Sequence, residues 1–213
     1  MAQPRFQRRK EERPAEITQA ALEAFAEHGY AATRVDDVAK RAGVSKGLLY
    51  LYFKTKEELF KAVIRGVVVP RVDALKTAIA DTELSAEEFL QGPYLEFIQK
   101  LPDSPAHIVI RLLIAEGPKH PDLTAYYFDQ VISGGMDALR QLINRGVRHG
   151  EFRQSDLAEF PQLMISPVLM SIIWRTLFQK YYPLDTDKLL QTHIDLILRA
   201  IKLPPGDTPG GAT

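Results

Sequence analysis

The residues whose types and spacing best suit a chemical task lie between Thr33 and Lys56, in the stretch TRVDDVAKRAGVSKGLLYLYFKTK. Two short apolar stripes meet there at the segment 42–45, Ala-Gly-Val-Ser. This segment predicts two helices joined by a tight turn. It offers a small residue, a glycine that can adopt positive φ, an apolar residue for the core and a serine that can cap the next helix. A helix-turn-helix of this kind places its second helix in the major groove of DNA.

The N-terminal residues of that second helix, expected over residues 45–53, have the chemistry needed to face base edges. Ser45 caps the helix, Lys46 can donate to guanine O6 or N7, and Leu48 can contact a thymine methyl group. Gly47 has no side chain, so the backbone can come close to the DNA at that point.

The aromatic residues of the same helix divide between its two sides. Leu49 and Phe53 are four positions apart and form the expected buried pair. The hydroxyls of Tyr50 and Tyr52 then remain available for phosphate oxygens on the flanking backbone.

Residues at the starts of the neighbouring helices extend the candidate DNA surface. Lys56 begins the following helix, and Thr33 and Arg34 begin the preceding one, where all three can contact phosphates. The alternative also stands, because many three-helix units bind no nucleic acid and exposed tyrosines often serve packing.

The chain lacks the patterns that would nominate an enzyme or a metal protein. It contains no cysteine, no HExxH, no phosphate-binding GxxxxGK[ST] and no Rossmann-type glycine pattern. Its five histidines lack metal-like spacing; they are His28, His107, His120, His149 and His193. We therefore expect no cofactor and no metal, with an all-α enzyme or a helical scaffold bearing a non-functional DNA-binding head as the alternatives.

The elements that must position these residues are all helical, since no segment alternates with period two. Caps, glycines and prolines predict about nine helices, hence an all-α protein. The expected ranges are 14–29, 33–43, 45–53, 55–80 with a bend at Pro70, 85–101, 105–117, 121–148, 156–181 and 186–203.

Residues 14 to 65 resemble the N-terminal domain of the TetR (AcrR-like) family of transcriptional regulators. The resemblance rests on the following positions: Ala24-Phe25, Gly29-Tyr30, Thr33, Val38-Ala39, Ala42-Gly43-Val44-Ser45, Leu49-Tyr50, Tyr52-Phe53 and Lys56-Glu57-Glu58-Leu59. It implies a homodimeric and mostly repressing protein that binds a palindromic operator, with a fourth helix leading to a ligand-binding and dimerisation core.

The resemblance also implies which residues contact DNA. These are Thr33, Lys46, Gly47, Tyr50, Tyr52 and Lys56. Leu48 departs from the family pattern, where a small polar residue is common, and this puts hydrogen-bonded base readout at that position in doubt.

The charge distribution fits a division of the chain into a DNA-binding part and a remainder. Up to Arg65 there are 13 Lys and Arg against 9 Asp and Glu, a net charge of +4, whereas the whole chain is neutral. We expect a basic flexible arm at residues 1–13, a DNA-binding domain at 14–60, a ligand-binding and dimerisation domain at 61–203 and a disordered tail at 204–213.

Aromatic, methionine and polar side chains of the second part are candidates to line a site for a small-molecule effector of unknown identity. They are Tyr94, Phe97, His107, Arg111, Tyr126, Tyr127, Gln130, Met164, Trp174 and Phe178. Arg111 stands out because it interrupts the apolar run 108–115. The alternative for the aromatic residues is ordinary core packing, and for Arg111 it is a bond to a helix end or an acidic partner.

The last two long helices carry the apolar stripes expected of a dimer interface. The stripes are Leu157, Phe160, Met164, Val168, Ser171 and Ile172, and Leu189, Ile194, Ile197, Leu198 and Ile201. Two helices from each subunit predict an intermolecular four-helix bundle. The effector is then expected to act by shifting the helix at 105–117 against the helix at 55–80, which changes the spacing of the two DNA-binding heads.

The chain shows neither a secretory signal nor an apolar run long enough to span a membrane. We therefore expect a soluble cytoplasmic protein whose partners are operator DNA, a second copy of itself and a small-molecule effector.

Overall fold

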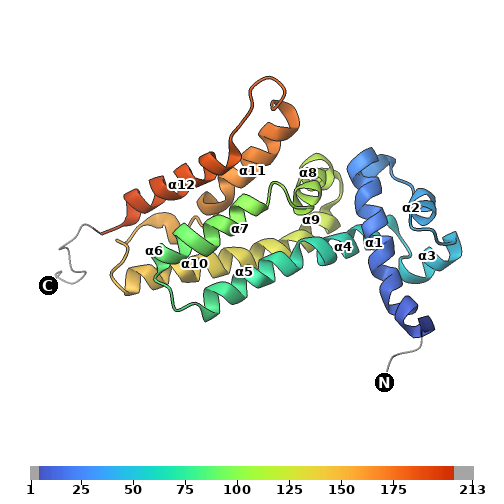
Figure 1. Cartoon of the computed structure of the whole chain (residues 1–213), viewed down its shortest axis with the longest axis horizontal. Helices are drawn as coiled ribbons and strands as arrows, with labels where there is room; N and C mark the ends of the chain where they lie inside the picture. The colour runs from blue at the N-terminus through green and yellow to red at the C-terminus, as the bar shows by residue number, and fades with distance from the viewer. Residues whose placement is uncertain (1–4, 204–213) are drawn as a thin grey trace. The chain divides into compact units, whose positions relative to one another are not determined.

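A computed structural model describes the backbone of residues 5–203 and the side chains of residues 13–203 (Figure 1). The expected tail at 204–213 and the first four residues of the expected arm lie outside the described residues. Within the described range the chain is helical, and its only β feature is an isolated bridge between Phe152 and Lys202.

The helices, with the short 3₁₀ and π segments written η, have the following bounds: α1 Arg5–Ala32, α2 Val35–Arg41, α3 Lys46–Tyr52, α4 Lys56–Val67, α5 Val69–Asp81, α6 Ala86–Phe89, η1 Leu90–Tyr94, α7 Leu95–Lys100, α8 Ala106–Glu116, η2 Gly117–Lys119, α9 Pro121–Tyr127, η3 Phe128–Ile132, α10 Ser133–Arg148, η4 Asp156–Ala158, α11 Gln162–Leu177 and α12 Thr186–Ile201. When segments that follow one another without a loop are counted together and the isolated 3₁₀ turn η4 is left aside, the described residues form nine helical runs. The expected all-α class is confirmed.

The first compact unit contains the residues up to Pro70 together with Ile108–Gln130. In it α1 packs against α2 and α4, α2 packs against α3, and α4 packs against α9. The rings of Phe25, Tyr30 and Phe60 form its aromatic centre, with centroids 5.3 to 5.6 Å apart. These three side chains come from α1 and α4, so the core of this unit fixes the platform on which α2 and α3 rest.

The helices α8 and α9 belong to this unit through specific polar and aromatic contacts. Arg111 on α8 donates to the carbonyl of Ala26 on α1 at 3.1 Å, and Arg65 on α4 donates to the hydroxyl of Tyr126 on α9 at 3.0 Å. The contacts therefore do not divide the chain at the expected boundary between residues 60 and 61. The reason is that α8 and α9 contact α1 and α4, the helices that support α2 and α3.

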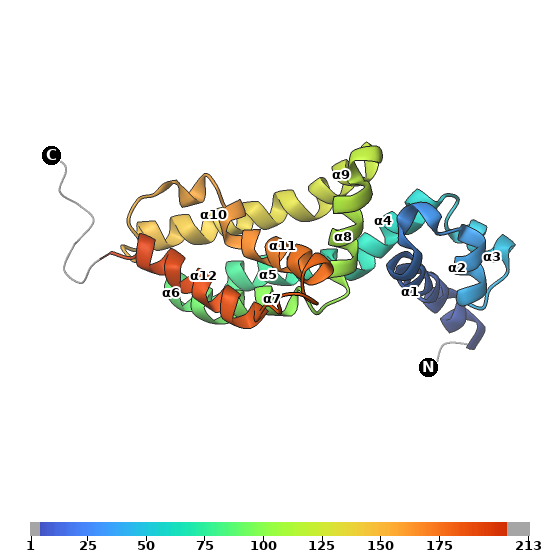
Figure 2. The same cartoon turned by 90° about the horizontal axis from the view of Figure 1, so that it is seen from above.

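The second compact unit is formed by the described parts of Arg71–His107 and Val131–Thr213. Its α12 packs against α7 and α11, and Figure 2 shows α12 running alongside α7. The segment that contains Gly92-Pro93 is a π-helical turn, η1, and α10 runs on through Gly134 and Gly135. Proline removes a backbone donor from the helical ladder, which accounts for the irregular turn at Pro93.

Three helix ends differ from the expected ones. The first helix begins at Arg5 and passes through Pro14, so residues 5–13 are helical where a flexible arm was expected, in keeping with the many good helix formers among them. The helix expected from Asp156 instead starts as a short 3₁₀ turn and resumes at Gln162. Glu58 accepts from the backbone N–H of Lys54, where the expected capping box would have used Thr55.

Candidate functional site

The turn between α2 and α3 has the geometry expected for a helix-turn-helix. Gly43 adopts φ 64°, a conformation that other residues rarely take. The backbone N–H of Val44 donates to the carbonyl of Ala39, and the hydroxyl of Ser45 accepts from the N–H of Leu48 at 3.2 Å. The predicted roles of Gly43 and Ser45 in the turn are therefore confirmed.

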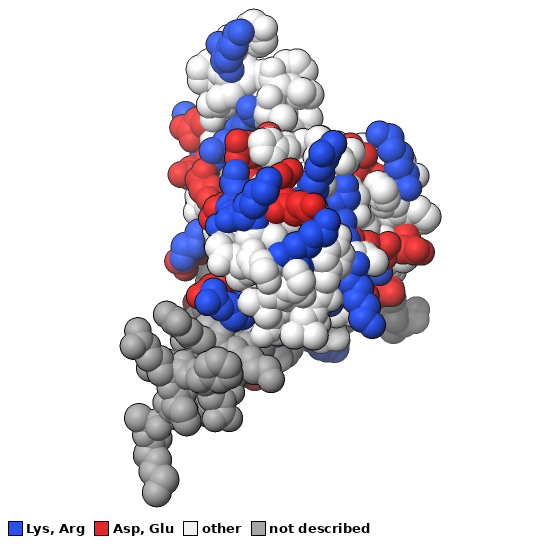
Figure 3. Space-filling view, turned by 90° about the vertical axis from the view of Figure 1, so that its right-hand side faces the viewer, with Lys and Arg blue, Asp and Glu red and all other residues white. Residues whose placement is uncertain are grey.

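The helix α3 is held by one side and leaves the other side open. Leu49 is its only buried residue, and Phe53, directly after the helix, is buried as well. Tyr50 is exposed, and Leu51 is 72 % exposed. Figure 3 shows an uncharged area bordered by Lys and Arg side chains, with Asp and Glu side chains among them. Such a surface suits a polyanion with apolar groups between its charges.

Gly47 lies on the exposed side of α3, and nothing in the protein explains why this position lacks a side chain. A Cβ atom built there meets no other atom within 4 Å. Glycine inside a helix costs about 0.5–1 kcal/mol relative to alanine. Glycine at this position therefore lowers helix stability but leaves the backbone exposed. Close approach by an external partner requires such an exposed backbone.

Lys46, the first residue of α3, is paired with the first turn of α2. Its ammonium lies 2.8 Å from the carboxylate of Asp36 and 5.9 Å from the ring centroid of Tyr50. The hydrogen bond to Asp36 raises the pKa of Lys46 above its ordinary value. Sequence reasoning selected Lys46 and missed Asp36, because an acidic residue in a first turn is explained by the helix dipole alone.

Lys56 does not offer its ammonium to a phosphate. It donates to the backbone carbonyls of Tyr30, Ala31 and Thr33 at 2.7, 2.9 and 3.2 Å. Its burial lowers the pKa of this lysine. The ammonium predicted to contact a phosphate is thus engaged inside the protein, because three carbonyls at and just beyond the C-terminal end of α1 occupy its three protons.

Thr33 is also turned inward. Its side chain is buried, and its hydroxyl donates to the carbonyl of Gly29 at 2.6 Å and that of Ala24 at 3.2 Å. The N-cap position of α2 is occupied by Arg34, and the hydroxyl of Thr33 is engaged inside the protein, so it is not free for the predicted DNA contact. The hydroxyl is used where α1 ends at Gly29, whose φ is 77°.

Two cations of this unit remain free to act outward. Among the described residues, no hydrogen bond or ion pair engages the side chains of Arg34 and Lys54, and both residues are exposed. Arg34 was predicted, whereas Lys54 was missed together with Leu51. The sequence could have indicated both. Leu51 lies two positions from each of the buried Leu49 and Phe53, so it points to a different side of the helix. Lys54 directly follows the residue that ends the helix.

The remaining predicted DNA contacts occupy the edge of the same surface. Ser45 is exposed but uses its hydroxyl oxygen as a cap, and Leu48 is half-buried. Tyr52 is half-buried against Phe53, with ring centroids 6.5 Å apart. The structure thus brings Arg34, Lys46 and Tyr50 to the exposed surface of the unit and withdraws the side chains of Thr33 and Lys56.

The candidates for the effector site divide between the two units. Arg111, Tyr126, Tyr127 and Gln130 belong to the first unit. There Arg111 bonds to Ala26, Tyr126 accepts from Arg65, and burial raises the pKa of Tyr127 to about 12. The bond of Arg111 to a carbonyl of α1 matches the structural alternative for that residue.

Tyr94 is the most unusual of the candidates in the second unit. It is fully buried on η1, stacks on Phe97 with centroids 6.4 Å apart, and its hydroxyl has no hydrogen-bond partner among the described residues. Burial raises the pKa of this hydroxyl well above its ordinary value, so it stays protonated and acts as a donor. A buried donor without an acceptor lowers the free energy of unfolding by about 1–3 kcal/mol. A bound ligand could supply the acceptor that the described residues do not.

The other candidates of the second unit serve local packing. The Nδ1 atom of His107 lies 2.8 Å from the carbonyl of Ser104, and Met164 is fully buried. Trp174 packs against Phe178 at 5.2 Å between ring centroids and donates to the carbonyl of Tyr182.

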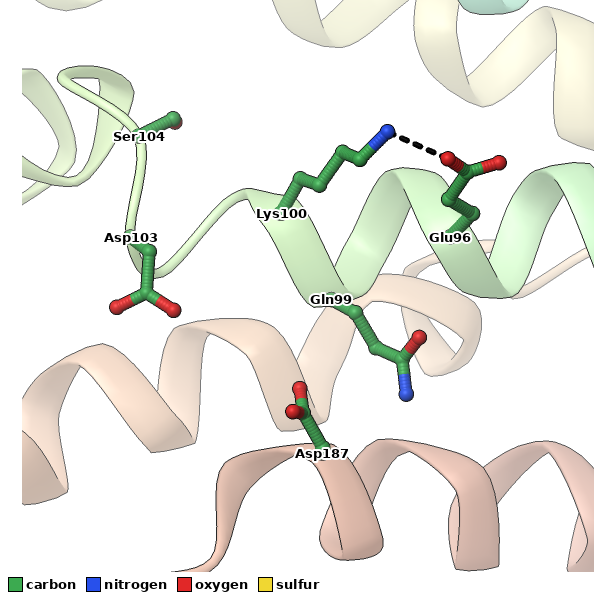
Figure 4. Close-up of a pocket in the computed structure, with 6 residues that line it drawn as sticks. All are labelled: Glu96, Gln99, Lys100, Asp103, Ser104 and Asp187. Carbon is green, nitrogen blue, oxygen red and sulfur yellow. Dashed lines mark hydrogen bonds and ion pairs between the residues drawn. The ribbon is translucent and has the colours of Figure 1, made fainter.

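Two hollows open in the second unit. One, of about 370 Å³, is lined by polar residues of the α7 region and the start of α12, and Figure 4 shows Lys100 turned toward Glu96 with Asp103 and Asp187 nearby. The other, of about 240 Å³, has a mostly apolar lining from α5 to α7 that includes Leu75 and Phe97. Only the second has the apolar character common in sites for organic ligands.

No group of three or more His, Asp or Glu in the described ranges is arranged to hold a metal ion. No helix there combines the length and the apolar character needed to cross a lipid bilayer.

Comparisons with known proteins agree with this geometry. The family model "Bacterial regulatory proteins, tetR family" matches residues 17–63, and the model "AefR-like transcriptional repressor, C-terminal domain" matches residues 88–200. The chain is 24% identical to the fatty acid metabolism regulator protein of Bacillus subtilis over 90% of its own length and 98% of that protein. It is 26% identical to the HTH-type transcriptional repressor KstR2 of Mycolicibacterium smegmatis over 90% and 92% of the two chains.

Among solved structures, the chain is similar to the transcriptional regulator FadR from Bacillus subtilis in complex with stearoyl-CoA. The TM-score is 0.71 at 24% identity, and the match covers 86% of this chain and 97% of that one. The likeness extends through both compact units and supports the fold described above.

Proposed function

Because the chain belongs to the TetR family of transcriptional regulators, we propose that it is a ligand-responsive homodimeric repressor that binds a palindromic operator through α3. Membership in the family confirms the expected DNA-binding regulator over the alternative of an all-α enzyme. The operator, the dimer and the effector are the parts of the proposal that experiments must establish.

The observation that carries the DNA-binding role is the open side of α3. Gly47 has free space around it, Leu51 and Tyr50 are exposed, and the free cation Arg34 stands at the N-cap of α2. A helix fixed by one buried leucine and capped by Ser45 is rigid enough to hold these groups in a groove.

The substitution Gly47→Leu tests this role without relying on loss of the fold. A Cβ atom at this position has no neighbour within 4 Å, and leucine has a higher helix propensity than glycine, so thermal stability should be unchanged or higher. Binding to an operator selected from random duplexes should fall by more than about tenfold, measured by fluorescence anisotropy, because the side chain fills the space that the base edges need.

The matched control is Gly92→Leu, at a position that is also open and exposed but lies on η1. It should leave operator affinity intact. If the wild-type protein selects no duplex at low salt, the scaffold alternative replaces the repressor; if Gly47→Leu binds as well as wild type, α3 is not the reading element.

We place the dimer interface on a face of α11 and α12 that the protomer leaves uncovered. Exposed apolar residues recur along α11 at spacings of seven, three and four, and Leu196 lies exposed on α12. The α11 stripe consists of Leu163, Met170, Ile173 and Leu177. Exposed apolar stripes on two long helices are typical of subunit interfaces.

The protomer itself buries part of the stripe that the sequence predicted for this interface, whereas Phe160 of the same stripe is 54% exposed. Met164, Val168, Ile172, Ile194 and Leu198 are buried within the protomer. They hold α11 and α12 to each other and to α7, so the interface must use the neighbouring apolar positions.

For the effector, we propose an acyl thioester or a related lipid carbonyl compound bound within residues 61–203. The relative from Bacillus subtilis is named a fatty acid metabolism regulator, and the similar FadR structure is in complex with stearoyl-CoA. The buried hydroxyl of Tyr94 supports this class because it is a protonated donor without an acceptor, and a thioester carbonyl supplies one.

Tyr94→Phe tests the effector contact. It removes an unpaired hydroxyl, so stability should stay equal or rise, while the stearoyl-CoA concentration that releases operator DNA should rise about tenfold. Tyr181→Phe removes the same atom from a tyrosine that is 75% exposed, and its effector response should match wild type. An unchanged response in Tyr94→Phe would exclude this hydroxyl as the contact.

Signal transmission is proposed to run through α8 and α9. Both helices are tied to the DNA-binding helices, by Arg111 to Ala26 and by Tyr126 to Arg65, and both continue into the second unit through the chain. Effector binding that moves α8 therefore moves α1 with it and changes the spacing of the two heads in the dimer. Because operator DNA is its partner, we also propose a cytoplasmic location.

A further inference from the structure

The ion pair between Lys46 and Asp36 joins the two helices of the helix-turn-helix at their N-terminal ends. The two side chains meet at 2.8 Å, and they are 60% and 47% exposed. Lys46 is the first residue of α3, and Asp36 lies in the first turn of α2. The pair therefore sits at the end of α3 that a helix-turn-helix presents to base edges.

Stability does not account for this pair. Exposed ion pairs contribute about 0–1 kcal/mol, and a carboxylate on a surface that meets DNA is repelled by phosphates. Asp37, the next residue, also lies in the first turn of α2 and pairs with Lys40 at 3.8 Å within that helix. The helix dipole can explain either acidic residue, but only Asp36 reaches the reading helix.

Resting on the proposed operator binding, we propose that Lys46 and Asp36 act as one unit that recognises a single G·C base pair in each half-site. A lysine ammonium has three donors. One is held by Asp36, and two remain for N7 and O6 of guanine. The second oxygen of Asp36 accepts from the N4 amino group of the paired cytosine.

The geometry of the pair matches that base-pair edge. Guanine O6 and cytosine N4 are hydrogen-bonded neighbours about 2.9 Å apart, and the ammonium and carboxylate are separated by 2.8 Å. The major-groove edge of a G·C pair presents two acceptors, guanine N7 and O6, followed by a donor, cytosine N4. The Lys46 ammonium supplies two donors, and the Asp36 carboxylate supplies the acceptor. An A·T edge has no such run of acceptors and adds a methyl group, so it satisfies fewer of the three bonds.

Asp36 accordingly determines which base pair is preferred and does not increase the affinity for DNA in general. The pair carries no net charge and adds nothing to non-specific attraction by phosphates. Without Asp36, Lys46 becomes a free cation that can turn to the nearest phosphate. Removal of the carboxylate should therefore strengthen binding to unrelated DNA while relaxing the choice of base at one position.

The test compares Asp36→Ala with Asp37→Ala in the full-length protein. Both variants remove one negative charge from the first turn of α2, so their effects on the helix dipole and on general DNA attraction are matched. Preferred duplexes are selected from a random pool, and the affinities of the best site and its single-base variants are measured by fluorescence anisotropy. Circular dichroism verifies that both variants are folded.

The wild type and Asp37→Ala should prefer G·C at one position of each half-site by about tenfold. Asp36→Ala and Lys46→Ala should each reduce that preference to about twofold at the same position, with no further loss in the double variant, since a single unit has been removed. Asp36→Ala should bind unrelated duplex at least as tightly as wild type.

Preference at that position retained in Asp36→Ala, or relaxed equally in Asp37→Ala, would overturn the recognition unit and leave the repressor standing. Relaxation of different positions by Asp36→Ala and Lys46→Ala would do the same. A wild-type protein that selects no site would overturn the proposed function and this inference together.

Discussion

The helix-turn-helix and the α11–α12 pair are both proposed to meet an outside partner, but their sequences distinguish inside from outside in different ways. On α3 one buried residue, Leu49, stands against an exposed side that carries a lysine, a glycine and a tyrosine. On α11 the buried side contains Met164 and Val168, and the exposed side is apolar as well. Apart from Leu51, which is 72% exposed, polarity distinguishes the two sides of α3, whereas both sides of α11 are apolar.

The difference teaches where local signals suffice. In the helix-turn-helix, a positive φ at Gly43 and the cap at Ser45 fix the backbone within a few residues of the side chains that matter. In α11 the pattern of apolar residues is compatible with either face being the core. Only packing against α7 and α12 chooses between them.

The largest expected effect is on the free energy of unfolding, at Leu49, the buried residue that holds α3 in place. Leu49→Ala should lower the free energy of unfolding by roughly 3 kcal/mol, since it leaves a cavity beneath the helix. Leu51→Ala makes the same change two positions away on an exposed side chain and should alter stability by less than about 0.5 kcal/mol. Urea unfolding followed by circular dichroism measures both, and equal losses would mean that α3 has no distinct inner side.

The uncovered face of α11 should respond to charge as a subunit interface does. Met170→Glu should weaken the dimer by about 2–3 kcal/mol, because the new carboxylate is buried without a partner on association. Leu84→Glu is the control, since Leu84 is similarly exposed, 43% against 46% for Met170, and lies outside α11 and α12. Analytical ultracentrifugation that finds both variants as dimers would place the interface elsewhere.

Substitutions at Lys56 and Lys54 should have smaller effects on different quantities: the first on stability, the second on the salt dependence of operator binding. Lys56→Ala leaves three carbonyls without their donor and should lower stability by about 1–3 kcal/mol, with the salt dependence of operator binding unchanged. Lys54→Ala should leave stability unchanged and reduce the slope of log affinity against log salt by about one. A reduced slope in Lys56→Ala would restore it as a phosphate contact.

The smallest effect concerns His193 on α12. Burial lowers its pKa below the ordinary 6.5, partly opposed by a hydrogen bond with the backbone of Leu163, and its Nε2 has no partner among the described residues. The unfolded chain thus binds a proton that the folded chain resists, so stability falls as pH drops through the window below 6.5.

His193→Asn should flatten the dependence of the melting temperature on pH between about 5 and 8. His149→Asn, at a side chain that is 63% exposed, should leave that dependence as in wild type. Identical pH profiles for wild type and His193→Asn would contradict the assignment.

The failed predictions in the DNA-binding unit have a common cause. The sequence placed Thr33 and Lys56 at helix starts next to the reading helix, which is correct as to position. Their polar atoms instead meet the carbonyls at and after the end of α1, some twenty residues earlier in the chain for Lys56. Sequence spacing does not report that an orphan helix end lies within reach of a side chain.

The sequence by itself determined the all-α class, the glycine turn, the serine cap and the helix that faces outward, because each depends on backbone conformation or side-chain polarity within a few residues. Tertiary structure alone decided which cations are free, which side of α11 is core and that Lys46 is joined to Asp36. Those outcomes depend on which distant atoms come within bonding distance, and only the packed helices set that.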